Sequence, residues 1–243
     1  MTIKTFFKIL YQPYKWLIFG PLLVCTTLLC GALAFLGAKL TGPRFGSIFG
    51  VIWARLNSLV TPMLVETRGR HNIDKTQSYV IVSNHQSQYD IFVLYGWLGI
   101  DFKWVMKQEL RKVPALGIAC ERIGHIFIDR SNTEAALRSL DEAKSKIVNG
   151  TSVIFFPEGT RSRDGNLGTF KKGAFKMALD LGIPILPVTI AGTRAILPTK
   201  SFDLFPGRAS MTIHPPVAIS GYDKKSMKAL MAETRDIIAS VPR

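Results

Sequence analysis

The fold can be approached from one stretch of the chain: residues 79–90 read Tyr-Val-Ile-Val-Ser-Asn-His-Gln-Ser-Gln-Tyr-Asp. Its first part, Tyr79–Val82, is apolar and β-branched and predicts a buried strand. A second apolar run, Ile91–Leu94, predicts a helix after it. The polar residues between the two runs therefore lie at a strand-to-helix junction, where buried strands of α/β sheets commonly end in functional loops.

His85 and Asp90 are the candidate catalytic residues of this junction. On a regular helix, residues five positions apart point about 140° away from each other. The two side chains can therefore meet only if His85 lies ahead of the helix that carries Asp90. The carboxylate then fixes the imidazole tautomer, and the other ring nitrogen can take a proton. The alternative is a polar helix-cap region, with Asn84 and Ser87 or Gln88 as caps, that does no catalysis.

Composition restricts the class of protein. The chain has 243 residues, 47% of them hydrophobic, and a formal net charge of +14. This length suits one α/β domain with an appendage, and the basic surface suits an anionic partner. The sequence contains no zinc finger, recognition helix or RNA-binding aromatic strand, so anionic membrane lipid is favoured over nucleic acid. Cys25, Cys30 and Cys120 have neither metal nor disulfide spacing, which indicates small buried residues in a reducing compartment.

The N-terminal quarter predicts two membrane-associating helices. Residues 1–15 mix lysines with aromatic side chains, and Trp16–Ala38 is uncharged and long enough to span a bilayer, which takes about 20 residues. Phe45–Val65 has helical periodicity and is interpreted either as an interfacial helix or as a helix packed on the catalytic domain. The sequence thus predicts a membrane-anchoring segment over residues 1–64 and a second domain over 65–243. Flanking basic residues place that domain on the cytoplasmic side. Hydropathy leaves open whether the first helix crosses the bilayer or enters one leaflet.

Strands and helices alternate from residue 65 onward. We expect strands at Val65–Arg68, Tyr79–Val82, Phe102–Val105, His125–Ile128, Ser152–Phe156, Ile185–Ile190 and Ser210–Ile213. We expect helices at Ile91–Gly99, Val113–Glu121, Thr133–Val148, Gly173–Leu181 and Lys224–Ser240. Ser131 and Glu134 have the spacing of a capping box. The alternation predicts an α/β fold, a mixed sheet flanked by helices.

A second polar block follows the strand expected at Ser152–Phe156. Gly159 permits a tight turn that exposes backbone N–H groups. Arg161 and Arg163 can hold a phosphate, and Glu158 can hold an arginine or a substrate hydroxyl. The alternative is a salt-bridged surface turn.

Two further strand ends and one lysine complete the candidate site. The block Gly124–Arg130 ends in an Asp-Arg pair, whereas Ile183–Val188 is bounded by prolines and is interpreted as structural. Lys107 is a candidate anion ligand. One base and several arginines, with no metal cluster and no Walker loop, predict deprotonation of a hydroxyl on a phosphorylated substrate, and the apolar N-terminus favours a lipid.

These blocks together resemble the glycerolipid acyltransferase family, specifically the bacterial 1-acyl-sn-glycerol-3-phosphate (lysophosphatidate) acyltransferases. The family's Asn-His-x-x-x-x-Asp motif is matched by Asn84, His85 and Asp90, and its Phe-Pro-Glu-Gly-Thr-Arg-Ser block by Phe156–Ser162. Gly124–Arg130 and Ile183–Val188 are similar to the other two blocks of the family. The resemblance covers residues 79–190 with order and spacing preserved.

The resemblance implies transfer of an acyl chain from acyl-CoA or acyl-carrier protein to the sn-2 hydroxyl of 1-acyl-sn-glycerol 3-phosphate, giving phosphatidate. It implies no cofactor and no covalent acyl-enzyme. His85 is then the general base, Asp90 orients it, and backbone N–H groups around Gly159 are candidate oxyanion donors. The glycerophosphate site that the resemblance implies consists of Arg130, Glu158, Gly159, Thr160 and Arg161.

The resemblance also implies a location and leaves alternatives. Residues 1–64 are similar to the family's two-helix membrane motif, which places the protein at the inner membrane with its catalytic domain on the cytoplasmic face. Another lysolipid, such as lyso-ornithine lipid or lysophosphatidylglycerol, or glycerol 3-phosphate itself, remains an alternative acceptor. A non-catalytic lipid-binding protein is the alternative from another class. A hydrolase is less favoured because the sequence has no Gly-x-Ser-x-Gly elbow.

Overall fold

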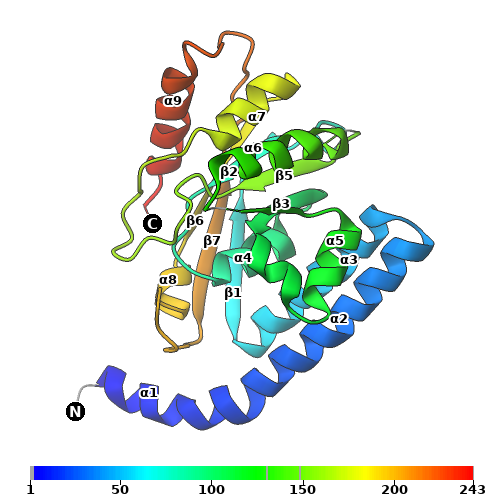
Figure 1. The fold of residues 1–243 in the computed structure, drawn as a ribbon. Helices are drawn as coiled ribbons and strands as arrows, with labels where there is room; N and C mark the ends of the chain where they lie inside the picture. The colour runs from blue at the N-terminus through cyan, green and yellow to red at the C-terminus, as the bar shows by residue number, and fades with distance from the viewer. Residues whose placement is uncertain (1–2, 130, 148, 243) are drawn as a thin grey trace.

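The computed structural model describes residues 3–129, 131–147 and 149–242. Over these residues it contains one seven-stranded sheet with the strand order β1-β7-β6-β2-β5-β3-β4 (Figure 1). The strands are β1 (Met63–Arg68), β2 (Val80–Ser83), β3 (Phe102–Lys107), β4 (Ile126–Ile128), β5 (Ser152–Phe155), β6 (Ile185–Ala191) and β7 (Gly207–Ile213). All expected strands are therefore confirmed, with boundaries that differ by up to three residues.

The sheet is mixed, as predicted. Strand β2 lies at its centre and pairs in parallel with β5 and β6, and β3 and β4 continue in the same direction. Strand β7 is antiparallel to β6, and the edge strand β1 pairs in parallel with β7. The carboxyl ends of β2, β3, β4, β5 and β6 therefore share one edge of the sheet, where α/β folds place their ligand sites.

Helices cover both faces of the sheet. They are α1 (Ile3–Tyr14), α2 (Gly20–Leu40), α3 (Pro43–Val60), α4 (Tyr89–Trp97), α5 (Leu116–Ile123), α6 (Thr133–Glu142), α7 (Gly173–Leu181), α8 (Thr193–Ile196) and α9 (Met227–Ala239). Short 3-10 turns occupy Arg70–Asn72, Gln108–Lys112 and Ala143–Lys146. Helices α3, α4 and α8 pack on one face, and α6, α7 and α9 on the other (Figure 1). Alternate residues of β2 divide between these cores, with Ile81 on the first face and Val80 and Val82 on the second.

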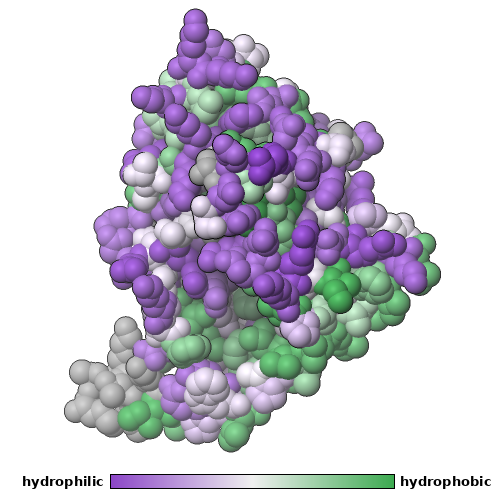
Figure 2. Space-filling model, viewed as in Figure 1, coloured by the Kyte–Doolittle hydropathy of each residue, from purple (hydrophilic) through white to green (hydrophobic). Residues whose placement is uncertain are grey.

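The N-terminal helix is long and apolar. A π-helical turn, Lys15–Phe19, joins α1 to α2. Pro21 has no backbone N–H to donate, and the N–H of Gly20 donates to the carbonyl of Lys15, five residues back, which is the π-helical hydrogen-bond pattern. The segment Ile9–Leu40 is one helix that is long and apolar enough to cross a membrane, and its most apolar stretch of 18 residues has a mean hydropathy of 2.2. It extends along one side of the molecule, where hydrophobic residues gather on the surface (Figure 2). These features indicate membrane association.

Helix α3 returns antiparallel to α2 and buries its small side chains. A Cβ at Gly46 would lie 2.7 Å from the carbonyl oxygen of Ala34, so the glycine permits the close approach of the two helices. The other side of α3 exposes apolar side chains, namely Phe45, Ile48, Ile52, Leu56 and Leu59. Helix α3 therefore fits both interpretations, since it packs on α4 and still presents an apolar stripe.

Two local predictions for the helices are wrong. Cys25, which was expected to be buried, is exposed, whereas Cys30 and Cys120 are buried. The capping box expected at the start of α6 does not form. The N-cap of α6 is Asn132, whose side-chain oxygen accepts from the backbone N–H of Ala135 at 3.0 Å. Ser131 does not form the predicted capping box, because its hydroxyl and backbone N–H both bond to the carboxylate of Asp129. The nearer asparagine and the competing Asx turn together move the N-cap from Ser131 to Asn132, while the helix begins at Thr133 as expected.

Candidate active site

His85 and Asp90 form the pair that their spacing predicts. The Nδ1 atom of His85 lies 2.7 Å from Oδ2 of Asp90. Helix α4 begins at Tyr89, so His85 lies in the loop before the helix while Asp90 is inside its first turn. A carboxylate can only accept, so Nδ1 carries the hydrogen and Nε2 is left with its lone pair. The geometry is that of a base with an orienting carboxylate.

Asp90 is completely buried and holds the loop in shape. Its Oδ2 also accepts the backbone N–H groups of Gln86 at 2.7 Å and Ser87 at 2.9 Å. Its Oδ1 accepts the hydroxyl of Thr193, at the start of α8. Buried charge is tolerated when such donors satisfy it. The same carboxylate thus positions the imidazole and the backbone on either side of it.

The imidazole of His85 is fixed by the Phe156 block. The ring stacks on Phe156 with 3.8 Å between centroids and 10° between planes, and its side chain is 15% exposed. The backbone N–H of His85 donates to Oε1 of Glu158 at 2.9 Å, and its carbonyl accepts from Ser162 N at 2.7 Å. The two predicted blocks are therefore in direct contact, although 73 residues separate His85 from Glu158.

Asn84 has a different role from the one predicted. Its side-chain oxygen accepts from the backbone N–H of Ile190 at 2.8 Å, and its nitrogen donates to the carbonyl of the same residue at 2.9 Å. Asn84 therefore ties the loop that carries His85 to β6 and does not cap α4. The N-cap of α4 is Gln88, whose side chain makes no capping hydrogen bond, while the hydroxyl of Ser87 accepts from the backbone N–H of Tyr89 at 3.1 Å.

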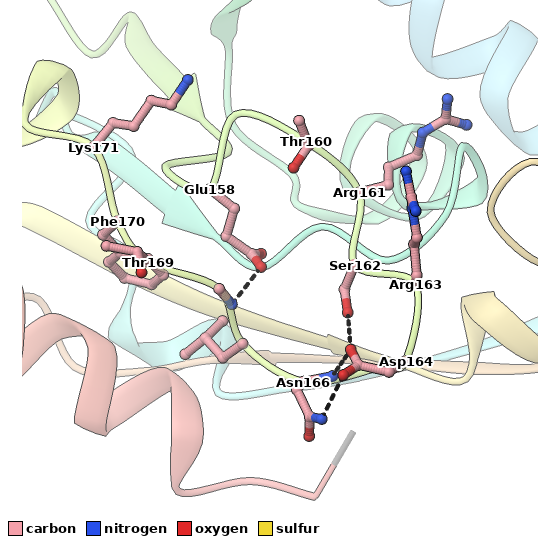
Figure 3. A pocket seen from close by; sticks show the side chains of 12 residues that line it. Glu158, Thr160, Arg161, Ser162, Arg163, Asp164, Asn166, Thr169, Phe170 and Lys171 are labelled. Atoms are coloured by element: carbon pink, nitrogen blue, oxygen red, sulfur yellow. Dashed lines mark hydrogen bonds between the residues drawn. The ribbon is translucent and has the colours of Figure 1, made fainter.

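The loop after β5 lines a polar pocket of about 790 Å³ (Figure 3). Its lining residues are Glu158, Thr160, Arg161, Ser162, Arg163, Asp164, Asn166, Leu167, Gly168, Thr169, Phe170 and Lys171. Glu158 Oε2 accepts from the backbone N–H of Gly168 at 2.7 Å, so Glu158 braces the loop as well as the histidine. Backbone and side-chain donors of Asn166 hold the pKa of Asp164 at about 2, so that the carboxylate stays charged and keeps the loop closed.

Gly159 adopts the left-handed backbone conformation, with φ of +72°. This backbone conformation disfavours any residue other than glycine, and a Cβ here would lie 2.8 Å from Nζ of Lys171, which would have to move. The N–H of Gly159 closes the turn by donating to the carbonyl of Phe156 at 3.0 Å. Thr160 and Arg161 follow directly and line the polar pocket.

An apolar cavity of about 420 Å³ opens beside His85. Its walls come from helices α2, α3, α4 and α5 and from strand β3. The lining residues of the N-terminal helices are Thr27, Cys30, Gly31 and Ala34 of α2 and Phe49, Gly50 and Trp53 of α3. The others are Ile91 and Tyr95 of α4, Leu116, Ala119, Cys120 and Ile123 of α5, and Trp104–Lys107 of β3. His85, Phe156 and Arg161 line it too, and so does Lys107, whose ammonium lies 3.9 Å from Glu109. Arg161 lines both the cavity and the polar pocket, so the two spaces meet at this residue, and His85 lines the cavity as well.

The far end of the cavity contains buried polar groups. Tyr95 lies six residues into α4, about 9 Å along the helix axis from its start. Its hydroxyl is 3.3 Å from Nε2 of His125. Burial first, and then the charges of Lys103 and Lys146, lower the pKa of His125 to about 3, and burial raises the pKa of the Cys120 thiol to about 12. Both groups are therefore neutral near pH 7 and compatible with an apolar ligand.

The blocks Gly124–Arg130 and Ile183–Val188 contribute less to the candidate site than the two blocks described above. Arg130 lies outside the described residues, and its neighbour Asp129 is half-buried and bonds to Ser131. The proline-bounded block is the buried strand β6, as predicted, and the carbonyl of Pro187 accepts from His214 N at 3.0 Å. Among the described residues, no cluster of three or more His, Cys, Asp or Glu side chains has the arrangement of a metal site.

Two threonines that support the loop carrying His85 are not among the residues identified from the sequence. Thr193 bonds to Asp90, and the hydroxyl of Thr199 bridges the carbonyl oxygens of Gln86 at 3.0 Å and Ser162 at 2.9 Å. The position of Thr193 and Thr199 in the sequence indicates their location, since both follow the carboxyl end of β6 at the edge of the sheet where His85 lies. From the sequence, the block that forms β6 is interpreted as structural.

Known proteins are similar to this chain over the region that contains the candidate site. The family profile described as Acyltransferase matches residues 64–191, which include His85, Asp90 and the Phe156 block. The 1-acyl-sn-glycerol-3-phosphate acyltransferase BAT2, chloroplastic, of Brassica napus is 35% identical over 176 residues, 72% of this chain and 51% of the relative. The alpha form of the same enzyme from Mus musculus is 34% identical over 181 residues, 74% of this chain and 64% of the relative. The chain thus spans between half and two thirds of the length of these relatives.

A solved structure extends the similarity to the whole fold. The crystal structure of the 1-acyl-sn-glycerophosphate (LPA) acyltransferase PlsC from Thermotoga maritima superposes with a TM-score of 0.79 at 26% identity. The match covers 96% of this chain and 94% of that one, and so includes the N-terminal helices. With more than half of its length matched by the family profile, this chain belongs to the acyltransferase family.

Proposed function

We propose that this protein transfers an acyl chain from acyl-CoA or acyl-carrier protein to the sn-2 hydroxyl of 1-acyl-sn-glycerol 3-phosphate, giving phosphatidate. The observation that carries the proposal is the His85–Asp90 pair, which lies where an apolar cavity meets a polar pocket at Arg161. The cavity suits an acyl chain, the pocket suits a glycerophosphate, and the base lies between them. The names of the plant, mouse and Thermotoga relatives support this choice of acceptor.

The proposed reaction is a direct attack. Nε2 of His85 takes the proton of the acceptor hydroxyl as its oxygen bonds to the thioester carbonyl carbon. The carbonyl electrons move to oxygen, and backbone N–H groups of the Gly159 turn are candidate donors for that oxyanion. When the intermediate collapses, the C–S bond breaks and the imidazolium returns its proton to the thiolate. The products are the new ester and free thiol, so the reaction needs the acyl donor as co-substrate and no cofactor.

We propose a membrane location that the same arrangement supports. The helix Ile9–Leu40 and the exposed stripe of α3 support a membrane-bound protein, because both acceptor and product are membrane lipids. We assign the catalytic part, residues 65–243, to the cytoplasmic face of the inner membrane, where acyl-CoA and acyl-carrier protein are available. Residues 1–64 are the proposed anchor. Lys107, at the cavity, and Arg130 are proposed further anion ligands.

Replacement of Arg161 by alanine is expected to raise the acceptor KM about 10- to 100-fold, since a charge-assisted hydrogen bond contributes about 1.5–3 kcal/mol. The KM for the acyl donor should change much less. Steady-state kinetics with each substrate varied in turn will measure this. The matched control is Arg138→Ala, which removes an equal charge from an exposed position on α6. An unchanged acceptor KM in Arg161→Ala would exclude the phosphate-binding role.

Replacement of Cys120 by phenylalanine is expected to shorten the acyl chain that the enzyme accepts. The new ring fills the cavity beside Tyr95 and His125, far from His85. We expect kcat/KM for long-chain acyl-CoA to fall at least about 10-fold, while short-chain acyl-CoA loses much less. A series of donors of increasing length will measure the shift, with Cys120→Ala as the control that adds no volume. Equal losses for all donors would show that the cavity does not hold the donor chain.

The function itself is tested with the purified full chain in detergent. It is incubated with labelled acyl-CoA, or with acyl-carrier protein carrying the label, and a panel of lysolipids. The panel contains lysophosphatidate, lysophosphatidylglycerol and lyso-ornithine lipid, with glycerol 3-phosphate as the non-lipid acceptor. Labelled phosphatidate is the expected main product. Preferential acylation of another acceptor would replace the proposed substrate, and no acylated product from any pair would overturn the proposal.

A further inference from the structure

The segment between α8 and β7 carries an unusual exposed aromatic side chain. Phe202 is 77% exposed and lies beside Trp16 of the N-terminal helix, with 6.4 Å between ring centroids. Trp16 is itself 60% exposed, and the next residue, Leu17, is 75% exposed. Figure 1 shows the connection between α8 and β7 at the same side of the molecule as this helix. We call Phe202 and Trp16 together the aromatic patch.

The aromatic patch is held together by a buried lysine. Lys15 is 8% exposed, and its ammonium donates to the carbonyl oxygen of Phe202 at 2.8 Å. The same ammonium lies 4.6 Å from the centre of the Trp16 ring, within the range of a cation–π contact. The contact joins parts of the chain 187 residues apart, so the apolar helix and the catalytic part are fixed relative to each other at this point.

The segment has a defined conformation that keeps Phe202 outward. The backbone N–H of Phe205 closes it by donating to the carbonyl of Ile196 at 2.9 Å. Leu204, two residues after Phe202, is 4% exposed and packs in the core. An apolar side chain that neighbouring residues hold in water has a free-energy cost that is recovered when the side chain enters an apolar phase.

The other end of the segment supports the catalytic loop. The carbonyl of Leu197 accepts the hydroxyl of Ser87 at 2.7 Å, and Thr199 bridges the carbonyl oxygens of Gln86 and Ser162. Gln86 and Ser87 both donate to Asp90. Residues 197–205 thus link the aromatic patch at one end to the loop that carries His85 at the other.

We infer that residues 197–205 form a second membrane-contact surface, in which Phe202 and Trp16 enter the interfacial region of an anionic phospholipid bilayer. Continuity with the helix Ile9–Leu40 identifies the bilayer as the occupant, because Trp16 belongs to that helix. Charge supports it, since Lys200 on the segment and Arg208 just after it are exposed and the whole chain has a net charge of +14. This contact of Phe202 and Trp16 with the bilayer fixes the distance between His85 and the membrane surface.

A fluorescent label at position 202 tests the contact independently of catalysis. Cys25→Ser removes the exposed cysteine, whereas Cys30 and Cys120 are buried. Phe202→Cys in this background is labelled with an environment-sensitive fluorophore and reconstituted in phosphatidylcholine vesicles containing phosphatidylglycerol. We expect a blue-shifted emission, quenching by lipids with a nitroxide near the headgroup, and loss of quenching by aqueous iodide. Glu134→Cys on α6, whose side chain is 85% exposed, is the matched control and should stay accessible to iodide.

Two results of the labelling experiment would overturn the inference. One is a label at 202 that remains as accessible to iodide as the label at 134. The other is a blue shift without vesicles that grows with protein concentration, which would assign the aromatic patch to a second copy of the chain.

A kinetic measurement then tests the link to catalysis, which rests on the proposed function. For Phe202→Ser, the ratio of kcat/KM on vesicle-bound acceptor to kcat/KM on a short-chain soluble acceptor is expected to fall about fivefold, as a partly immersed phenyl ring loses part of its transfer free energy. Phe202→Leu should retain most of the ratio. An unchanged ratio in Phe202→Ser would refute the link. If the parent protein acylates neither acceptor, the proposed function fails, while the labelling result still decides the membrane contact.

Discussion

Replacement of His85 by alanine is expected to abolish acyl transfer, with kcat reduced about 10³-fold or more, in line with the contribution of a positioned general base. The reason is the arrangement of the ring. Its Nδ1 is committed to Asp90 and its ring stacks on Phe156, so Nε2 is the nitrogen left to take a proton, and His85 lines the apolar cavity. Alanine removes the proton acceptor and leaves an acceptor hydroxyl that is not nucleophilic at neutral pH.

The fold should survive this substitution, which separates a chemical role from a structural one. The side chain of His85 contributes one hydrogen bond and one stacking contact, whereas its backbone N–H and carbonyl keep their bonds to Glu158 and Ser162. Initial rates, circular dichroism and the melting temperature are measured on the same preparations. His71→Ala is the matched control, because His71 is exposed in the 3-10 turn Arg70–Asn72. Normal turnover in His85→Ala with an intact fold would refute the base assignment.

Much of the fold was predictable because its signals are local. The inner strands of the sheet are short, mainly apolar runs, and the central strand β2 is buried on both faces, as the run Tyr79–Val82 indicates. The contact between His85 and Asp90 was also predictable, because a five-residue separation excludes a position on one face of a helix and requires the junction that the structure contains. Sequence spacing therefore decided geometry wherever both partners belong to one segment.

Contacts between distant segments were not predictable. The carboxylate of Glu158 looked available for a substrate, yet it accepts the backbone N–H of His85, 73 residues away. Thr193 bonds to Asp90 across 103 residues. Its position after the carboxyl end of β6 indicates the shared edge of the sheet but not this hydrogen bond. The apolar cavity has walls from α2, α3, α4, α5 and β3, so its existence depends on how the N-terminal helices pack on the sheet. Such features arise from tertiary packing, which no local pattern encodes.

Replacement of Asp90 by asparagine is expected to reduce kcat about 10²- to 10⁴-fold while preserving the fold, because it removes charge and keeps shape. The amide oxygen can take the place of Oδ2 and accept from Nδ1 of His85 and from the backbone N–H groups of Gln86 and Ser87. The amide nitrogen then donates to the hydroxyl of Thr193, which can accept as well as donate. Orientation of the imidazole is therefore retained. What is lost is the negative charge that stabilises the imidazolium when His85 takes the acceptor proton.

Comparison with alanine at the same position separates charge from structure. Asp90→Ala leaves two buried backbone N–H groups without their acceptor, at a cost of about 1–3 kcal/mol each, so its melting temperature should fall clearly below that of Asp90→Asn. Asp141→Asn, on α6, is the control for removing a carboxylate away from the site. Kinetics and thermal unfolding of the three variants are measured together. Because the amide preserves the hydrogen bonds, an Asp90→Asn protein with nearly parental kcat would mean that orientation alone, without the carboxylate charge, accounts for the contribution of Asp90 to catalysis.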